Sequence, residues 1–249
     1  MMIPKVINYC WFGNNPLDKR TKKCIDSWKK YCPDYQIVQW NESNFDTNCC
    51  DYVKEAYKAK KWAFVSDYAR FKILYEHGGI YLDTDVQLIK SIDDLVNKGP
   101  YMGYEAYCNN DMLNPNHESL VNSGLGMAAE PHMEIFKEIL DYYESQHFLY
   151  DDGSINQMTV VERVTKILKK HGLTGDGKLA VIKGLTVYPE DYLCPFNFTS
   201  GKTNITDNTY SIHLYSASWQ SSSAQFKNKI KRYLPVSFVN LISKIKHHE

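Results

Sequence analysis

Hydrophobic positions recur at two spacings along the chain, and each spacing predicts a different element. In residues 62–77 the aromatic side chains recur at steps of three and four, from Phe64 to Tyr75. This is the spacing of one face of an α-helix. The pair Gly78 and Gly79 follows, and glycine suits the left-handed conformation that ends many helices. The segment therefore predicts a buried helix closed by glycine.

The run 80–86 that follows this helix alternates between two sets of side chains and predicts a strand. Alternation along a strand places Asp83 and Asp85 on the same side, a few ångströms apart. Two like charges at that distance raise a pKa unless a cation lies between them. A hard divalent cation that takes oxygen ligands resolves the repulsion. The alternative is a solvated strand end or turn, where aspartate is common.

The predicted helix also contains an acid and a base, Asp67 and Arg70, three residues apart and therefore on one side. Spacing alone favours a surface ion pair, which contributes less than about 1 kcal/mol. The alternative is that both side chains point toward the two aspartates of the strand that follows.

The first part of the chain predicts a parallel sheet. A strand, a helix and a second strand alternate within residues 5–40, a pattern typical of parallel strands joined by right-handed crossovers. Ligands of such sheets bind beyond the carboxyl ends of the strands. Trp11, Trp40 and Asp83 lie at such ends, so we expect them in one crevice. The Trp11 ring would then either stack on a nucleotide base or pack in the core.

The second half of the chain continues the pattern of strands and helices. A small-residue segment, 121–128, contains Asn122. Small residues are typical where a ligand or a neighbouring backbone approaches closely, so both a ligand site and a tightly packed strand stay open. We predict strands over 101–105, 179–182 and 186–188, and amphipathic helices over 132–148 and 156–171. In the stretch 209–219, His213 lies beside an apolar strand and precedes a run of small polar residues and Trp219.

Composition narrows the class of protein. The 249 residues contain 29 basic and 29 acidic side chains, so no overall positive charge indicates nucleic acid. The seven cysteines form no CxxC pair, and the first residues do not resemble a signal peptide. Reduced thiols in a cytosolic protein are the simplest interpretation. No apolar run reaches the ~20 residues that cross a bilayer.

The last residues differ from the rest, so we divide the chain into a domain, 1–225, and a tail, 226–249. The tail has six lysine and arginine residues and no acid before Glu249, with apolar positions between them. A basic amphipathic segment of this kind predicts a helix on a membrane surface. The alternative is a terminal helix packed on the core.

Two stretches, SDYARFKILYEHGGIYLDTDV at 66–86 and IPKVINYCWFG at 3–13, resemble glycosyltransferase family 32. This group of DxD sugar transferases includes capsular-polysaccharide enzymes and is related to the glucosyltransferase domains of large clostridial toxins. The resemblance implies a GT-A fold, an α/β architecture with a mostly parallel central sheet flanked by helices. It also implies metal-dependent transfer of a sugar from a nucleotide-sugar donor, with a UDP-sugar preferred, and with retention of anomeric configuration.

The resemblance assigns roles to particular residues. Asp83 and Asp85 would hold Mn2+ or Mg2+, with His213 as third ligand, since an imidazole suits Mn2+ beside carboxylates; the related toxins use a carboxylate in that region. Asp67 and Arg70 would act as catalytic residues that anchor the sugar or its phosphate. The further donor contacts would be Trp11, Thr84, Asn122, Ser218 and Trp219.

We expect the acceptor to be a saccharide, lipid-linked, at the inner face of the cytoplasmic membrane, in the synthesis of capsule or another surface polysaccharide. Two other classes remain. One is a binding module that keeps the donor pocket without turnover. The other is a phosphatase of the haloacid dehalogenase type, which also has a strand ending in DxD. Its pattern requires Thr or Val where this chain has Gln87, so it ranks last.

Overall fold

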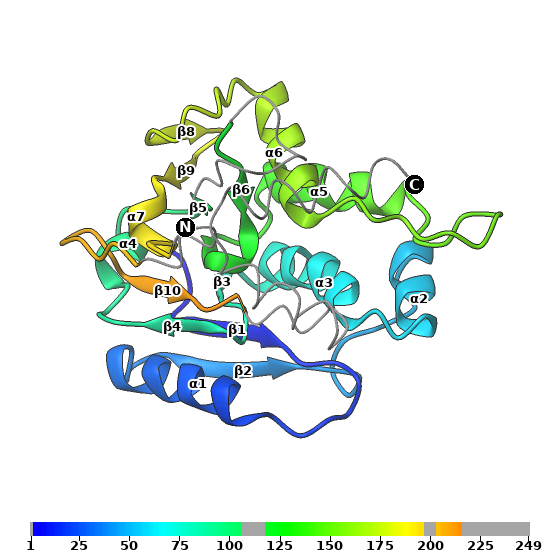
Figure 1. Cartoon of the computed structure of the whole chain (residues 1–249), viewed down its shortest axis with the longest axis horizontal. Coiled ribbons are helices and arrows are strands. Elements are labelled where there is room, and N and C mark those ends of the chain that lie inside the picture. Colours follow the sequence, from blue (N-terminus) through cyan, green and yellow to red (C-terminus); the bar gives the residue numbers. More distant parts are fainter. Residues whose placement is uncertain (1, 106–117, 197–202, 216–249) are drawn as a thin grey trace, which may run out of the picture.

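The computed structural model describes residues 2–105, 118–196 and 203–215, and a mixed sheet of eight strands runs through them (Figure 1). Its strands are β1 (Val6–Cys10), β2 (Gln36–Trp40), β3 (Gly79–Tyr81), β5 (Tyr101–Tyr104), β6 (Val121–Asn122), β7 (Met127–Ala129), β8 (Ala180–Ile182) and β9 (Leu185–Tyr188). Their order is β2-β1-β3-β7-β5-β9-β8, with β6 beside β5. The strands β1, β2, β3, β5 and β9 point one way, because β7 is antiparallel to both β3 and β5.

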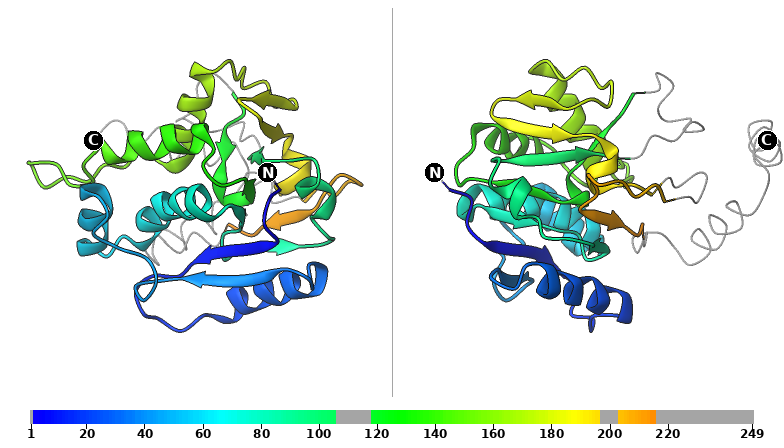
Figure 2. Two further views of the ribbon diagram at one scale, coloured as in Figure 1. Left: turned by 180° about the vertical axis from the view of Figure 1, so that it is seen from behind. Right: turned by 90° about the vertical axis from the view of Figure 1, so that its left-hand side faces the viewer.

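Helices cover both faces of this sheet and divide the core into two clusters. One cluster includes the buried sides of α2, α3, α5 and α6, and the other those of α1, α4 and α7. Figures 1 and 2 show α1 at the end of the molecule that lies furthest from α6 and β8. The predicted GT-A arrangement, with mostly parallel strands between two layers of helices, is confirmed. The helices are α1 (Lys19–Tyr31), α2 (Asp51–Lys58), α3 (Trp62–His77), α4 (Asp93–Val96), α5 (Glu134–Glu144), α6 (Val160–Lys170) and α7 (Glu190–Leu193).

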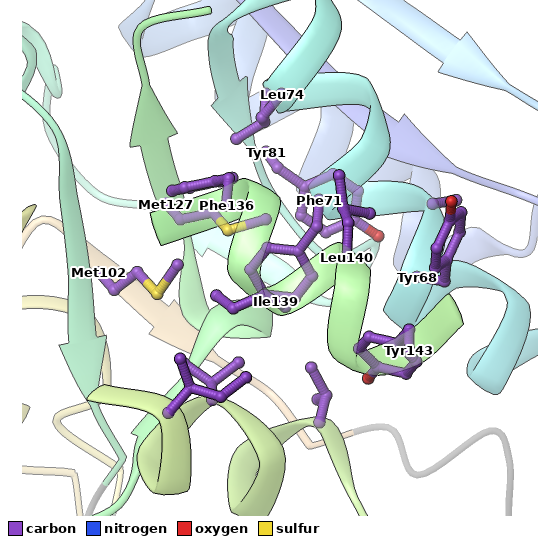
Figure 3. Close-up of a cluster of buried hydrophobic side chains, with 14 of the residues drawn as sticks. Tyr68, Phe71, Leu74, Tyr81, Met102, Met127, Phe136, Ile139, Leu140 and Tyr143 are labelled. Atoms are coloured by element: carbon purple, nitrogen blue, oxygen red, sulfur yellow. The ribbon is translucent and has the colours of Figure 1, made fainter. Parts of the chain in front are cut away.

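The helix α3 forms as its aromatic periodicity predicts. Its apolar side chains pack against α5, where the rings of Phe71 and Phe136 lie 5.5 Å apart between centroids (Figure 3). The helix ends at Gly78, which has a φ of 66°, and its amide donates to the Leu74 carbonyl. A Cβ on Gly79 would lie 2.8 Å from the Val6 carbonyl oxygen. Glycine is therefore required where α3 turns into β3 beside the first strand.

The predicted continuous strand over 80–86 is wrong. β3 ends at Tyr81, and β4 (Val86–Leu88) pairs with β10 (Ser211–His213) in a separate two-stranded sheet. Between β3 and β4 the backbone turns, with the Val86 amide donating to the Asp83 carbonyl at 3.0 Å. Aspartate and threonine favour turns because their side chains satisfy nearby backbone groups. The two aspartates therefore share a turn instead of one face of a strand.

The other predicted strands and helices are found with shifted ends, but the segment 121–128 is interrupted. The segment 121–128 is divided by the 3-10 helix η1 (Ser123–Leu125), so it is not one strand. The predicted tail, 226–249, and the residues Ser218 and Trp219 lie outside the described residues. Within the described residues, no helix has the length and apolar character that crossing a membrane requires.

Candidate metal and donor site

The turn between β3 and β4 brings two carboxylates to the imidazole of His213. One ligand atom from each of Asp83, Asp85 and His213 lies within 4.8 Å of the others. The His213 Nε2 atom lies 3.1 Å from Asp85 Oδ1. The pairing of β4 with β10 fixes this arrangement, because it places His213 opposite Val86 and lets the Leu214 amide donate to the Asp85 carbonyl. The three residues that the sequence assigned to the metal are thus brought together.

This donor set fits a divalent cation. His213 is 8% exposed, and its Nδ1 atom is buried without a hydrogen-bond partner in the part of the chain that the structure describes. Burial raises the pKa of the Asp83 carboxyl, although Arg70 opposes the shift and Asp85 adds to it. Burial lowers the pKa of His213, but the Asp85 carboxylate outweighs it and the pKa is raised. Two carboxylates and an imidazole are suitable ligands for Mn2+.

Arg70 is buried and joins α3 to the turn, so the surface ion pair favoured by spacing is wrong. One guanidinium nitrogen lies 2.9 Å from Asp67 Oδ1 and 3.2 Å from Asp83 Oδ1, and another donates to the Ser123 hydroxyl at 3.3 Å. The Arg70 side chain is 5% exposed and its guanidinium lies over the Tyr81 ring. Spacing shows only which residues share a side of a helix; here that side faces the end of the sheet.

Asp67 is a buried acid whose ionised form this arrangement disfavours. Burial raises the pKa of its carboxyl to about 6, although the Arg70 guanidinium opposes the shift. A carboxyl with a raised pKa is easier to protonate in the folded protein than in the unfolded chain. Its ionised form therefore lowers the stability of the fold, which is common for groups kept for function.

Replacing Asp67 by Asn is expected to stabilise the metal-free protein above pH 6. The contribution that wild type gains from protonating Asp67 is present below about pH 4 and is lost as the pH rises through about 6. Two pKa units correspond to about 3 kcal/mol, so the gain in unfolding free energy at pH 7.5 should approach that value. Urea unfolding between pH 4 and 8 measures it. A constant difference across this range would contradict the prediction, and the exposed Asp94→Asn serves as control.

The loop around η1 contains the predicted residue Asn122 and brings in two residues that the sequence did not identify, Glu105 and Gly124. Asn122 donates to Glu105 Oε2 at 3.0 Å and accepts from the Gly124 amide at 2.7 Å. A Cβ on Gly124 would lie 2.1 Å from Asp83 Oδ2 and 3.1 Å from Arg70 Nη1. The small residues at 121–128 thus allow a close approach to Asp83, and Asn122 holds the loop in place. Glu105 follows a parallel strand, β5, and this position was the signal for it.

The remaining predicted positions are Trp11, Thr84 and Trp40, and they differ in where they lie. Trp11 is half-buried at the end of β1, and its indole N–H donates to the Asn15 carbonyl at 2.6 Å. Thr84 lies in the turn between the two aspartates. Trp40 does not share their crevice: its ring stacks on His77, with centroids 5.3 Å apart, and lines a separate cavity. The role of Trp11 in binding a base stays a prediction.

Comparison with known sequences matches the segment that contains Asp83 and Asp85 to sugar transferases. A family model described as the glycosyltransferase sugar-binding region containing the DXD motif matches residues 18–101. Inositol phosphoceramide mannosyltransferase 3 of Schizosaccharomyces pombe is 35% identical over 101 residues, which are 38% of this chain and 27% of that protein. Uncharacterized glycosyltransferase L373 of Acanthamoeba polyphaga mimivirus is 25% identical over 230 residues, 88% of this chain and 84% of that protein. The chain therefore contains a glycosyltransferase sugar-binding region.

The matched lengths differ among these relatives. The match spans 27% and 33% of the length of the two S. pombe mannosyltransferases. Among solved structures, the PaToxG glycosyltransferase is 21% identical with a TM-score of 0.48, over 68% of this chain and 69% of that one. The galactosyltransferase LgtC, in complex with donor and acceptor sugar analogs, is 13% identical with a TM-score of 0.45, over 94% of this chain and 99% of that one.

Proposed function

We propose that this protein is a metal-dependent glycosyltransferase that moves a sugar from a nucleotide-sugar donor to a saccharide acceptor with retention of configuration. The observation behind the proposal is the cluster of Asp83, Asp85 and His213 after the carboxyl end of β3. The two aspartates lie inside the matched sugar-binding region, and His213 lies on β10, which pairs with β4 of that region. These residues would hold Mn2+ or Mg2+. The cation, when bound, acts as a Lewis acid that neutralises the departing diphosphate.

The chain's own residues position the donor around this cluster. Arg70 contacts both Asp67 and Asp83, so it fixes the orientation of the two carboxylates by charge-assisted hydrogen bonds. Asp67, with its side chain 14% exposed, would accept a hydrogen bond from a sugar hydroxyl. Asn122 holds the loop that packs against Asp83, and through it would shape the pocket for the sugar.

The nucleotide would lie along the end of β1. Trp11 would stack on the base, since its ring is only partly buried and lies beside a turn, and Thr84 would contact the diphosphate. Ser218 and Trp219 would complete the diphosphate contacts from the segment beyond β10. We favour a UDP-sugar because the tryptophan resembles the stacking residue of UDP-sugar enzymes; the names of the S. pombe relatives make mannose a further candidate.

The acceptor would be a lipid-linked saccharide at the inner face of the cytoplasmic membrane, in capsular or surface polysaccharide synthesis. Support comes from the S. pombe relatives, which are named for a lipid, inositol phosphoceramide. The basic tail, 226–249, would add contact with the membrane surface. This would make the enzyme a peripheral protein of the membrane.

Removing the metal is expected to stop donor hydrolysis. We would measure nucleotide release from a panel of UDP- and GDP-sugars after EDTA treatment, and again with Mn2+ or Mg2+ added. Lewis-acid stabilisation is worth several kcal/mol, so the rate should fall about 100-fold or more with EDTA and recover with metal. A rate that EDTA leaves unchanged would contradict the proposal. Donor binding without release of nucleotide under any condition would indicate a binding module.

A further inference from the structure

The helix α1 has one buried side and one strongly basic side. The buried side consists of Thr21, Cys24, Ile25, Ser27 and Trp28. The exposed positions recur at steps of three and four residues, so they form one stripe along the helix. At 1.5 Å per residue the stripe is ~17 Å long. Apart from Asp26, the exposed positions are all basic, namely Lys19, Arg20, Lys22, Lys23, Lys29 and Lys30.

This stripe is a local concentration of charge in a neutral chain. The whole protein has equal numbers of acidic and basic side chains, so the excess on α1 is not part of a general basic character. Asp26 lies 3.7 Å from Lys29, but both side chains are mostly exposed and the pair is weak. Lysine presents a hydrated point charge on a flexible stem, which suits a diffuse negative surface better than one bidentate ligand.

A cavity of about 280 Å³ lies beside the stripe, between α1 and the strands β1 and β2. Its apolar lining comes from Tyr9, Leu17, Ile25 and Ile37, while Lys22 and Lys29 reach it from the stripe. Asp26 also lines it. Apolar walls next to lysines match an amphiphile with an anionic headgroup, because the stems of lysine cover apolar groups while the ammonium stays in the polar region.

The buried side of α1 connects the stripe to the metal site. The indole N–H of Trp28 donates to the Val86 carbonyl at 2.8 Å, and the Leu88 amide donates to the Ser27 hydroxyl at 3.0 Å. The carbonyl of Val86 and the amide of Leu88 both belong to β4, the strand that follows the turn with Asp83 and Asp85. A surface that binds the stripe would therefore hold the metal site at a fixed distance from that surface.

We propose that the lysine stripe of α1, with its adjoining cavity, is a docking surface for a bilayer that contains anionic lipid. The helix α1 that carries the stripe lies at the outside of the molecule, next to the edge strand β2 (Figure 1). This proposal concerns other residues than the tail, 226–249, and does not depend on the activity proposed above. Each lysine near an anionic surface contributes about 1 kcal/mol, which is about fivefold in the partition coefficient.

The test is co-sedimentation of the full chain with vesicles of phosphatidylcholine alone or with 30% phosphatidylglycerol, at low and high salt. Wild type should bind only the anionic vesicles, and less at high salt. Four substitutions in the stripe, K22Q, K23Q, K29Q and K30Q together, should lower this partition at least tenfold. The matched control replaces four exposed lysines elsewhere, K54Q, K58Q, K61Q and K98Q, and should bind like wild type.

Three outcomes would overturn the proposal. They are no binding of wild type to anionic vesicles, equal binding by the stripe variant, and an equal loss in the control variant. Equal binding by the stripe variant would assign any membrane contact to another segment, such as the tail. Nucleotide release without acceptor should be the same in all three proteins, so a failure of the docking surface is distinguishable from a failure of the proposed function.

Discussion

Replacing Asp85 by Asn is expected to lower metal-stimulated nucleotide release about 10³-fold while the protein stays folded. Asparagine has the same shape as aspartate but no charge, so the cluster keeps one carboxylate and loses the partner of His213. Lewis-acid stabilisation worth about 4 kcal/mol corresponds to this factor. Asp85 is a cleaner target than Asp83, because Asp83 also pairs with the buried Arg70 and its loss would leave that charge less compensated.

Two readouts separate loss of metal from loss of structure. Titration of Mn2+ by electron paramagnetic resonance should show weaker binding by the Asp85→Asn variant, and its unfolding temperature should stay close to that of wild type. Asp151→Asn, in an exposed turn, is the matched control and should bind metal and release nucleotide normally. If the Asp85 variant transfers sugar at the wild-type rate, the role given to the cluster is wrong.

Local pattern was sufficient for the elements that scaffold the site. The aromatic spacing of α3 and its closing glycines are properties of neighbouring residues, and the structure confirms them. The break after Tyr81 could not be predicted in this way. It depends on the pairing of β4 with β10, which lies more than a hundred residues later in the chain. Alternation along 80–86 is compatible with either outcome, because a turn and a strand end favour the same residue types.

The site shows the same difference between what local sequence pattern reveals and what contacts between distant residues determine. The sequence identified Asp83, Asp85 and His213 as residues with suitable chemistry, and the structure brings them together. It did not reveal that Arg70 is buried, because its burial depends on contacts of its guanidinium with Asp83 and Ser123, which lie outside the helix. Nor did it identify Gly124, which matters because glycine has no Cβ and so leaves room for the Asp83 carboxylate. A close approach of backbone to a side chain leaves only a run of small residues as its signal.

Replacing Gly124 by Ala is expected to lower nucleotide release about 100-fold. The added Cβ would lie 2.1 Å from Asp83 Oδ2, 3.1 Å from Arg70 Nη1 and 3.1 Å from Asn122 Oδ1. A contact of 2.1 Å is far below van der Waals distance, so the Asp83 carboxylate or the loop must move by about 1 Å. A displacement of that size at a reacting centre costs about 100-fold. Steady-state kinetics and Mn2+ titration measure the two consequences.

The control for this variant is Gly153→Ala, which separates a contact effect from a backbone effect. A Cβ on Gly153 would meet nothing within 4 Å, but its φ of +80° is unfavourable for alanine. That variant should lose about 1 kcal/mol of stability and keep full activity. Gly124 has no such φ, so its variant should differ by losing activity and metal binding, in addition to the about 1–3 kcal/mol of stability that overpacking costs. Equal activity in both variants would mean that Asp83 does not need the space that Gly124 leaves.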